Sequence, residues 1–233
     1  MAPTDPRAAR LAKLRGLYAV TPDAADTFAL LAKCAAALDG GARAIQIRNK
    51  TSPPGLRREQ ARAIVQLCRA RGALAIVNDD PALAREVDAD GVHVGEDDAA
   101  IADARAVVGA QRLVGASCYD SLDRARTAVA AGADHVAFGS FFASGTKPLA
   151  RRAPLDLVPH ARALGVPVVA IGGIDEHNAR SLAQAGVDAI AVIGALFGHD
   201  DPDAVAGAAR RIAAAFAAGG DAFATSRILH PSS

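Results

Sequence analysis

Two adjacent aspartates stand where an apolar run ends. Residues 73–78 are apolar up to Asn78 and predict a buried β-strand, while Pro81 and the residues after it predict a helix. Because Asp80 directly precedes that proline, we expect it to be the N-cap of the helix. Asp79 has no such structural task, and an ionised carboxylate beside a core strand is costly unless it is paired. We therefore expect Asp79 to bind a metal or a substrate, with a hydrogen bond inside the loop as the alternative.

A second polar cluster belongs to the strand predicted at residues 44–48. Side chains alternate between the two faces of a strand. Gln46 and Arg48 therefore share one face, with Lys50 beyond them, and Ile45 and Ile47 take the opposite face. Polar side chains that point into a core are costly unless they are used, which favours a binding role for this cluster. An internal network of arginine and carboxylates is the alternative.

A third cluster, Glu96, Asp97 and Asp98, follows the next predicted strand. Acidic residues in the first turn of a helix complement the helix dipole, which is the structural interpretation of this run. A carboxylate from this loop could also share a hard cation with Asp79, because Mg²⁺ is commonly held by one or two carboxylates together with substrate phosphates. We expect His93, inside that strand, to be a hydrogen-bonded core residue rather than a metal ligand.

The elements that would position these clusters alternate eight times along the chain. Apolar strands are predicted at residues 16–20, 44–48, 73–78, 91–95, 113–117, 135–140, 166–173 and 189–194. Amphipathic helices are predicted between them, for example at residues 27–38, 55–71, 122–131, 176–185 and 202–216. Eight such pairs over this length are the signature of a single-domain α/β fold, the (β/α)8 TIM barrel. A doubly wound open sheet is the alternative.

The segments that lead into the even-numbered strands resemble one another. GGARAIQI, DADGVHV, AGADHVAF and AGVDAIAV each run from a small residue at a helix end into a strand, which suggests a repeated half-barrel unit. We expect residues 14–218 to form the catalytic barrel. Residues 1–13 are predicted to be a flexible segment, and residues 219–233 to be a mobile tail.

The composition excludes several classes of protein. The net charge is +1 and aromatic residues make up only 4% of the chain, so neither nucleic acid nor an anionic membrane is an expected partner. No stretch of about 18 apolar residues and no secretory leader is recognised, so no membrane span is expected. Cys34, Cys68 and Cys118 show neither disulfide nor zinc spacing, and a reducing cytoplasm is the expected location. The protein is expected to be a monomer or a small homo-oligomer.

Barrel enzymes carry their chemistry at the carboxyl ends of the strands, where all of these clusters fall. The loop after the sixth strand contains Ser144, Gly145, Thr146 and Lys147, which could wrap an anion, with a solvated surface loop as the alternative. The seventh strand ends in IGGI and the eighth at Gly194, in loops whose backbone N–H groups often bind a phosphate. The residues thus predict one mouth with two anion sites, and two phosphorylated small molecules as partners.

In their order along the chain, these motifs resemble the thiamine-phosphate synthase family. The resemblance covers about residues 14–200. Six motifs carry it: Q-x-R-x-K at Gln46 to Lys50, V-N-D-D at Val77 to Asp80, G-x-H-x-G before the acidic run ending at Asp98, G-x-S at Ser117, T-K at Thr146 and Lys147, and I-G-G-I at Ile171 to Ile174. Each motif alone is weak, but together at these spacings they are specific.

The resemblance implies a transferase that joins a pyrimidine diphosphate to a thiazole phosphate, with Mg²⁺ as cofactor, and releases diphosphate and thiamine phosphate. A carboxylated thiazole phosphate is an alternative substrate. The resemblance implies that the pyrimidine diphosphate is held by Gln46, Ile47, Arg48, Asn49, Lys50, Asn78, Ser117 and Lys147. It implies that the thiazole phosphate is held by Ser144, Gly145, Thr146, Gly173, Ile193 and Gly194. Mg²⁺ would be held by Asp79 and Asp98, and the catalytic residues would be the cationic Arg48, Lys50 and Lys147.

Two positions depart from the family pattern. Ser144 stands where a threonine is expected, and Gly194 stands where a serine often follows the isoleucine of the eighth strand. We expect weaker binding of the thiazole phosphate at most. The related thiazole tautomerase is one alternative, but it has a histidine two residues after the G-x-S serine, where this chain has Tyr119. A catalytically silent, phosphate-binding regulatory barrel is the other, and the retained metal and leaving-group residues argue against it.

Overall fold

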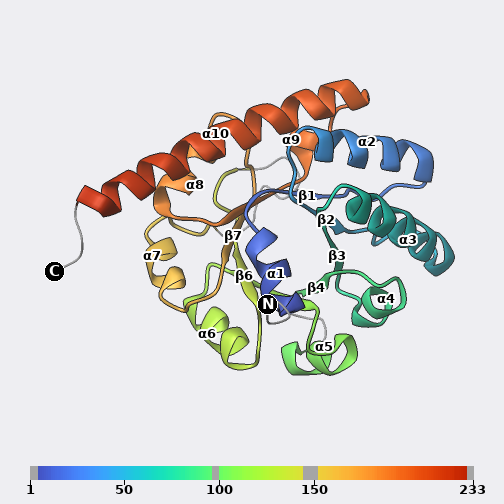
Figure 1. Ribbon diagram of the computed structural model, residues 1–233, viewed down its shortest axis with the longest axis horizontal. Coiled ribbons are helices and arrows are strands. Elements are labelled where there is room, and N and C mark those ends of the chain that lie inside the picture. Colours follow the sequence, from blue (N-terminus) through green and yellow to red (C-terminus); the bar gives the residue numbers. More distant parts are fainter. Residues whose placement is uncertain (1–4, 96–99, 144–151, 230–233) are drawn as a thin grey trace.

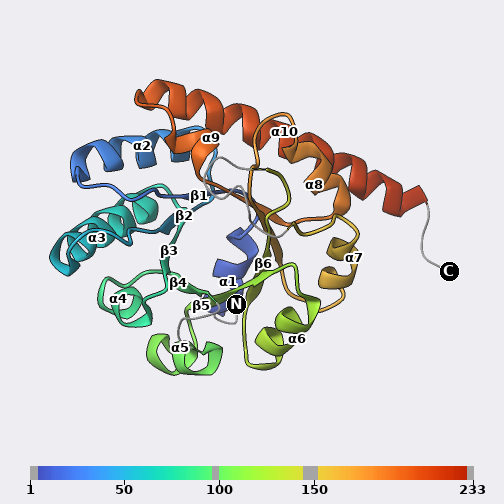
Figure 2. The same ribbon diagram turned by 180° about the vertical axis from the view of Figure 1, so that it is seen from behind.

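The computed structural model describes residues 5–95, 100–143 and 152–229, and it shows a closed barrel of eight parallel strands (Figures 1 and 2). The strands follow one another around the barrel in sequence order. They are β1 Gly16–Val20, β2 Ala44–Ile47, β3 Leu74–Asn78, β4 Gly91–Val94, β5 Leu113–Tyr119, β6 His135–Phe138, β7 Val168–Ile171 and β8 Ala189–Val192. Only β5 extends beyond its predicted range. The predicted TIM barrel is confirmed, and the closed ring excludes the open sheet.

Helices surround the ring of strands (Figure 1). They are α2 Thr27–Asp39, α3 Pro54–Ala70, α4 Pro81–Glu86, α5 Ile101–Val108, α6 Leu122–Ala130, α7 Leu157–Arg162, α8 Ala179–Ala185, α9 Gly194–Phe197 and α10 Pro202–Leu229. The predicted N-cap of α4 is confirmed, because the Asp80 carboxylate accepts a hydrogen bond from the Leu83 N–H at 2.9 Å. This cap, two residues after the end of β3, stabilises the first turn of α4.

Alternation along the strands separates two apolar layers. Inside the barrel, Tyr18, Leu74 and Ile76 are at most 1% exposed and belong to one cluster. The other face of each strand packs against the helices, as Ile45 of β2 does. Large side chains therefore fill the barrel itself, so that chemistry is confined to its ends.

An aspartate stands immediately before each of β4, β6 and β8. These are Asp90, Asp134 and Asp188, and in each case Oδ2 accepts a hydrogen bond from a backbone N–H near the start of the preceding strand, at 2.7 to 3.0 Å. The contact recurs at three of the segments that resemble one another in sequence. It gives the repeat a physical basis, because each aspartate ties an even-numbered strand to its odd-numbered neighbour.

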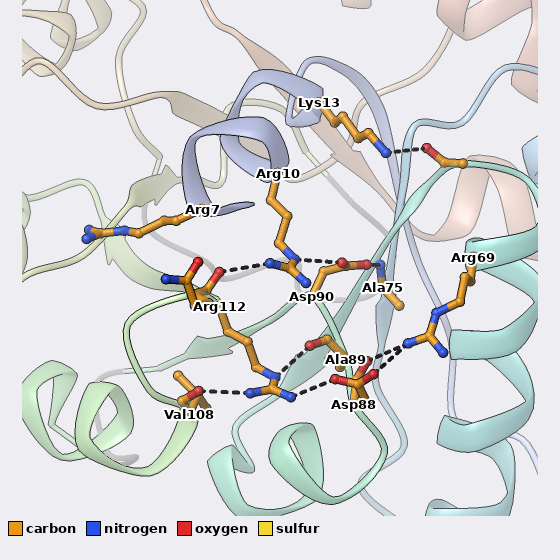
Figure 3. A network of polar contacts seen from close by, with 12 residues as sticks. Arg7, Arg10, Lys13, Arg69, Ala75, Asp88, Ala89, Asp90, Val108 and Arg112 are labelled. Atoms are coloured by element: carbon orange, nitrogen blue, oxygen red, sulfur yellow. Dashed lines mark hydrogen bonds and ion pairs between the residues drawn. The ribbon is translucent and has the colours of Figure 1, made fainter. Parts of the chain in front are cut away.

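Helix α1, Pro6–Lys13, lies across the amino end of the barrel (Figure 1). Leu14, directly after it, is 1% exposed inside the barrel, and Leu11 packs against the same cluster. Arg10 pairs with Asp90 at 2.9 Å (Figure 3), and Arg7 pairs with the carboxylate that precedes β6. Over Pro6–Lys13 the structure thus differs from the flexible segment that was expected for residues 1–13, because the leucine and arginines named above meet apolar and acidic partners that only the folded barrel assembles.

Helix α10 runs for 28 residues and packs against α2 and α8 (Figures 1 and 2). It continues through residues 219–229, which were expected to belong to a mobile tail. Gly219 does not end the helix: it allows close contact with α8, where a Cβ would stand 2.4 Å from the Arg180 carbonyl oxygen. In the described parts of the chain, no helix is long and apolar enough to cross a membrane.

Candidate active site

The carboxyl ends of β2 and β3 open onto a cavity of about 530 Å³. Its lining includes Asn49, Lys50, Arg57, Asn78, Asp79 and Asp103, which come from the loops after these strands and from α3 and α5. The cavity therefore lies at the end of the barrel where TIM-barrel enzymes carry their active sites. Four of the predicted site residues, Asn49, Lys50, Asn78 and Asp79, meet there.

Asp79 is held at the mouth by two side chains. Its Oδ2 lies 2.7 Å from Lys50 Nζ and accepts a hydrogen bond from Asn78 Nδ2 at 2.6 Å. The backbone N–H of Asp79 donates to the His93 carbonyl oxygen at 2.8 Å, and its φ is 62°, in the left-handed region. Such a conformation is uncommon outside glycine and is frequent at functional sites. Lys50 is thus the cationic partner that an ionised carboxylate beside a core strand was expected to need.

The carboxylate oxygens of Asp79 are the kind of ligand that a hard cation such as Mg²⁺ prefers. Its side chain is 22% exposed and lines the cavity at the mouth. Within the described residues, no group of three His, Cys, Asp or Glu side chains could enclose a metal. Mg²⁺ does not need such a cage, because it is usually bound by one or two carboxylates, waters and substrate phosphates. The second predicted ligand, Asp98, lies outside the described residues.

Gln46 points into the barrel, as its position in β2 predicts. It is 7% exposed, and its Nε2 donates a hydrogen bond to the Tyr18 hydroxyl at 3.2 Å. Burial raises the pKa of Tyr18, so this phenol stays neutral. The Gln46 amide is therefore held by Tyr18 of β1, inside the barrel and one period of the alternation before Arg48 at the mouth.

Arg48 follows Gln46 at the mouth and is held by the loop after β1. Thr21 Oγ1 accepts a hydrogen bond from the Arg48 N–H at 2.8 Å and donates to the Arg48 carbonyl oxygen at 2.9 Å. The Arg48 guanidinium lies 3.5 Å from Asp23, whose other carboxylate oxygen accepts from the Lys50 N–H at 2.6 Å. Both cationic residues of the motif are thus oriented by the end of β1.

Two residues predicted to touch the pyrimidine diphosphate engage the protein with their side chains. Ile47 is 7% exposed and packs in the outer apolar layer. Asn49 Nδ2, which carries two hydrogens, lies 2.8 to 2.9 Å from three acceptors, the Ala24 carbonyl oxygen, Ser52 Oγ and Gln60 Oε1. Any contact of these two residues with a ligand would therefore come from the backbone.

Ser117 ends the inward-facing row of β5 next to a buried histidine. His93 Nε2 lies 2.9 Å from Ser117 Oγ, and His93 Nδ1 lies 3.3 Å from His135 Nε2. Burial lowers the pKa of His93 to about 4, against a smaller opposing effect of Asp79. Burial, with a smaller contribution from His93, also holds the pKa of His135 well below its usual value. Both rings are neutral near pH 7, which agrees with the expectation of a hydrogen-bonded core histidine at position 93.

The predicted phosphate site at the ends of β7 and β8 is partly described. Gly173 has φ 63°, and a Cβ there would stand 2.2 Å from the Ala143 carbonyl oxygen, so only glycine lets these loops pass so closely. Ile193 precedes α9, which begins at Gly194, where a Cβ would meet no atom within 4 Å. The predicted Ser144, Gly145, Thr146 and Lys147 lie outside the described residues.

Sequence reasoning did not single out five residues that the structure places at the site: Thr21, Asp23, Arg57, Asp103 and His135. Thr21 and Asp23 directly follow β1, so the rule applied to the other strands would have identified them. His135 starts β6 and faces inward beside His93. Arg57 lies in the first turn of α3, where nothing in the local pattern distinguishes it from its neighbours.

Comparisons with known proteins agree with this geometry. A family model described as "Thiamine monophosphate synthase" matches residues 17–196. The chain belongs to the thiamine monophosphate synthase family. A thiamine-phosphate synthase of Chromobacterium violaceum is 55% identical over 206 residues, which are 88% of this chain and 98% of the relative. One of Azoarcus sp. is 53% identical over 191 residues, covering 82% and 93% of the two chains.

A solved structure supports the same assignment. The chain resembles a thiamine phosphate pyrophosphorylase from Pyrococcus furiosus with a TM-score of 0.78 and 36% sequence identity, over 91% of this chain and 98% of that one. As a member of the thiamine monophosphate synthase family, the chain is an enzyme, a transferase of thiamine biosynthesis.

Tyr119 stands where the tautomerase is expected to have a histidine. It is 40% exposed, and the Arg124 guanidinium carbon lies 5.8 Å from its ring centre.

Proposed function

We propose that the enzyme condenses 4-amino-2-methyl-5-(diphosphomethyl)pyrimidine with 4-methyl-5-(2-phosphoethyl)thiazole to give thiamine phosphate and diphosphate. The observation that carries the proposal is the pair of Lys50 and Asp79 at the mouth, with Nζ 2.7 Å from Oδ2, beside Arg48, which shares the Asp23 carboxylate with the Lys50 backbone N–H. Two cations and a carboxylate gathered over the end of a barrel suit a diphosphate with its metal. Family membership supports the same two phosphorylated substrates.

In this reaction the carbon–oxygen bond to the diphosphate breaks and its electron pair leaves with the diphosphate oxygen. The electron-rich aminopyrimidine supports the methylene cation that remains, and the lone pair of the thiazole nitrogen forms the new carbon–nitrogen bond. No side chain has to remove a proton. What the protein supplies is charge stabilisation on the leaving group and a thiazole held within reach.

The proposed roles divide between the two sides of the mouth. The pyrimidine diphosphate would be held by Gln46, Ile47, Arg48, Asn49, Lys50, Asn78, Ser117 and Lys147. The thiazole phosphate would be held by Ser144, Gly145, Thr146, Gly173, Ile193 and Gly194. Mg²⁺, when held by Asp79 and Asp98, would neutralise charge on the departing diphosphate.

Arg48 and Lys50 would act directly on the leaving group, together with Lys147. The Arg48 N–H donates to Thr21 Oγ1 and the Lys50 N–H donates to Asp23, which ties the backbone of both residues to the loop after β1. Removal of one such charged contact commonly lowers a rate by about a hundredfold or more.

We also propose a reducing cytoplasm as the location, because Cys34, Cys68 and Cys118 are all buried as free thiols.

Product analysis tests the proposed function. The purified chain, given both substrates and Mg²⁺, should form thiamine phosphate, identified by its mass and by oxidation to a fluorescent thiochrome. Omission of either substrate should abolish the product. A folded protein that forms no thiamine phosphate but isomerises the carboxylated thiazole phosphate would instead be a tautomerase, and one that does neither would be a silent barrel.

A further inference from the structure

Two buried histidines stand beside each other inside the barrel, below the hydroxyl of Ser117. His93 of β4 and His135 of β6 both pair in register with Gly115 of β5, so these three residues form one row across adjacent strands. His93 Nδ1 faces His135 Nε2 at 3.3 Å, and His93 Nε2 faces Ser117 Oγ at 2.9 Å. A chain of contacts therefore leads from His135 through His93 to a residue at the mouth.

Gly115 makes the contact between the two rings possible. A Cβ at this position would stand 2.1 Å from His135 Nε2 and 2.5 Å from His93 Nδ1. Real carbon atoms do not approach ring nitrogens so closely, so any larger residue would push the two rings apart. The row thus depends on glycine in the middle and a histidine on either side.

The hydrogen positions follow from which ring nitrogens have partners. Among the described residues, His135 Nδ1 is buried without a hydrogen-bond partner. A buried N–H without an acceptor is rarer in folded proteins than a buried acceptor without a donor. A neutral imidazole carries one N–H, so the proton of His135 belongs on Nε2, directed at His93 Nδ1. His93 then accepts at Nδ1 and carries its own proton on Nε2, directed at Ser117 Oγ.

We propose that His135 is a positioning residue that fixes the tautomer of His93, so that Ser117 accepts from His93 and keeps its hydroxyl hydrogen for the substrate diphosphate. The inference rests on the proposed function, because it takes Ser117 as a contact of the pyrimidine diphosphate. With the opposite tautomers, Ser117 would donate its only hydrogen to His93 and present only lone pairs to an anionic oxygen. His135 therefore acts on a substrate that it does not touch.

Nitrogen NMR of the full chain tests the tautomers without any substrate. In protein labelled with ¹⁵N-histidine, two-bond couplings between ring nitrogens and carbon-bound hydrogens distinguish the two neutral tautomers. The signals are assigned with His93→Gln and His135→Gln chains. Both rings should carry hydrogen on Nε2, and hydrogen on Nδ1 of either ring overturns the proposal. This readout needs no turnover, so its failure is distinct from a failure of the proposed function.

A matched pair of variants tests the effect on turnover. His135→Gln keeps an N–H donor near the position of Nε2, whereas His135→Met has similar length and no donor. The methionine variant should lower kcat by about tenfold, with an unchanged KM for the thiazole phosphate, while the glutamine variant should stay within about threefold of the wild type. Equal losses in two folded variants would show a packing role and overturn the proposal.

A double-mutant cycle separates this role from a general effect on the barrel. If His135 acts through Ser117, then His135→Met should change kcat little when it is added to Ser117→Ala. A further loss of about tenfold in that background contradicts the proposal. Circular dichroism and thermal unfolding establish that each variant folds, and if the methionine variant does not, the tautomers of the wild-type chain decide the question.

Discussion

Lys50 Nζ lies 2.7 Å from Asp79 Oδ2, across the gap between the ends of β2 and β3. Asp79 takes a left-handed backbone conformation, with φ 62°, in forming this contact. Under the proposed function, a bound diphosphate and its metal would separate the pair, because the ammonium would turn to a phosphate oxygen and the carboxylate to the cation. The contact therefore holds the two side chains together at the mouth before a substrate arrives.

Replacement of Asp79 should weaken the dependence on Mg²⁺. Asp79→Asn should raise the Mg²⁺ concentration for half-maximal activity by about tenfold or more, because an amide oxygen brings no charge to a hard cation. A magnesium titration of initial rates measures this. Asp80→Asn is the matched control: asparagine is as good an N-cap as aspartate, so the titration should stay close to that of the wild type. If the Mg²⁺ concentration for half-maximal activity rose equally in both variants, Asp79 would have only the alternative role of a hydrogen bond inside its loop.

Removal of the Lys50 ammonium should slow the release of the leaving group. Lys50→Met should lower kcat by about a hundredfold or more while thermal unfolding changes little, because the side chain is half exposed. Lys13→Met is the control, since Lys13 contacts the Gly72 carbonyl oxygen at the opposite end of the barrel (Figure 3). Steady-state rates of both variants decide the matter, and near-normal turnover of Lys50→Met would remove Lys50 from the mechanism.

The buried histidines should make stability fall with decreasing pH. Unfolded histidine takes up a proton near pH 6.5, whereas burial lowers the pKa of folded His93 to about 4. Between these values the unfolded chain binds more protons, so the free energy of unfolding decreases as pH falls, by on the order of 3 kcal/mol for His93. His135 acts in the same direction. Urea unfolding across this window measures the slope.

A variant isolates the histidine contribution from that of the carboxylates. His135→Gln removes one buried titrating ring and should make the dependence on pH shallower than in the wild type. Identical slopes for the two proteins would mean that His135 takes up its proton as readily in the folded chain as in the unfolded one.

The anchor of α1 should matter more for stability than an exposed ion pair. The Asp134 side chain is 1% exposed, and it pairs with Arg7 and Arg105. Asp134→Ala would remove the carboxylate partner of both arginines and leave a backbone N–H of β5 without its acceptor, which should cost about 3 to 5 kcal/mol. Asp123→Ala breaks a pair whose carboxylate is 90% exposed and should cost less than about 1 kcal/mol. Denaturant unfolding compares the two, and equal costs would contradict the role of Asp134.

Much of the fold follows from local patterns. Apolar runs of five to eight residues between amphipathic stretches identified all eight strands. Asp80 before a proline identified an N-cap, and alternation along β2 placed Gln46 inside the barrel. These features depend on neighbours in sequence, so the sequence alone determines them.

What local patterns could not predict depends on residues distant in sequence. The contact of Arg10 with Asp90 forms only when the barrel closes, so residues 1–13 looked like a free segment. The pairing of His93 with His135 spans 42 positions and depends on Gly115 between them. Likewise, the support that Thr21 gives to Arg48 joins two loops that no periodicity connects.

The central claim is tested most directly by diphosphate release from the purified chain. The rate is measured with both substrates and Mg²⁺ together, and again with each of the three components left out. The proposed function predicts rapid release only when all three are present, with thiamine phosphate formed in equal amount. Release that is independent of the thiazole phosphate, or no release by a folded protein, would contradict it.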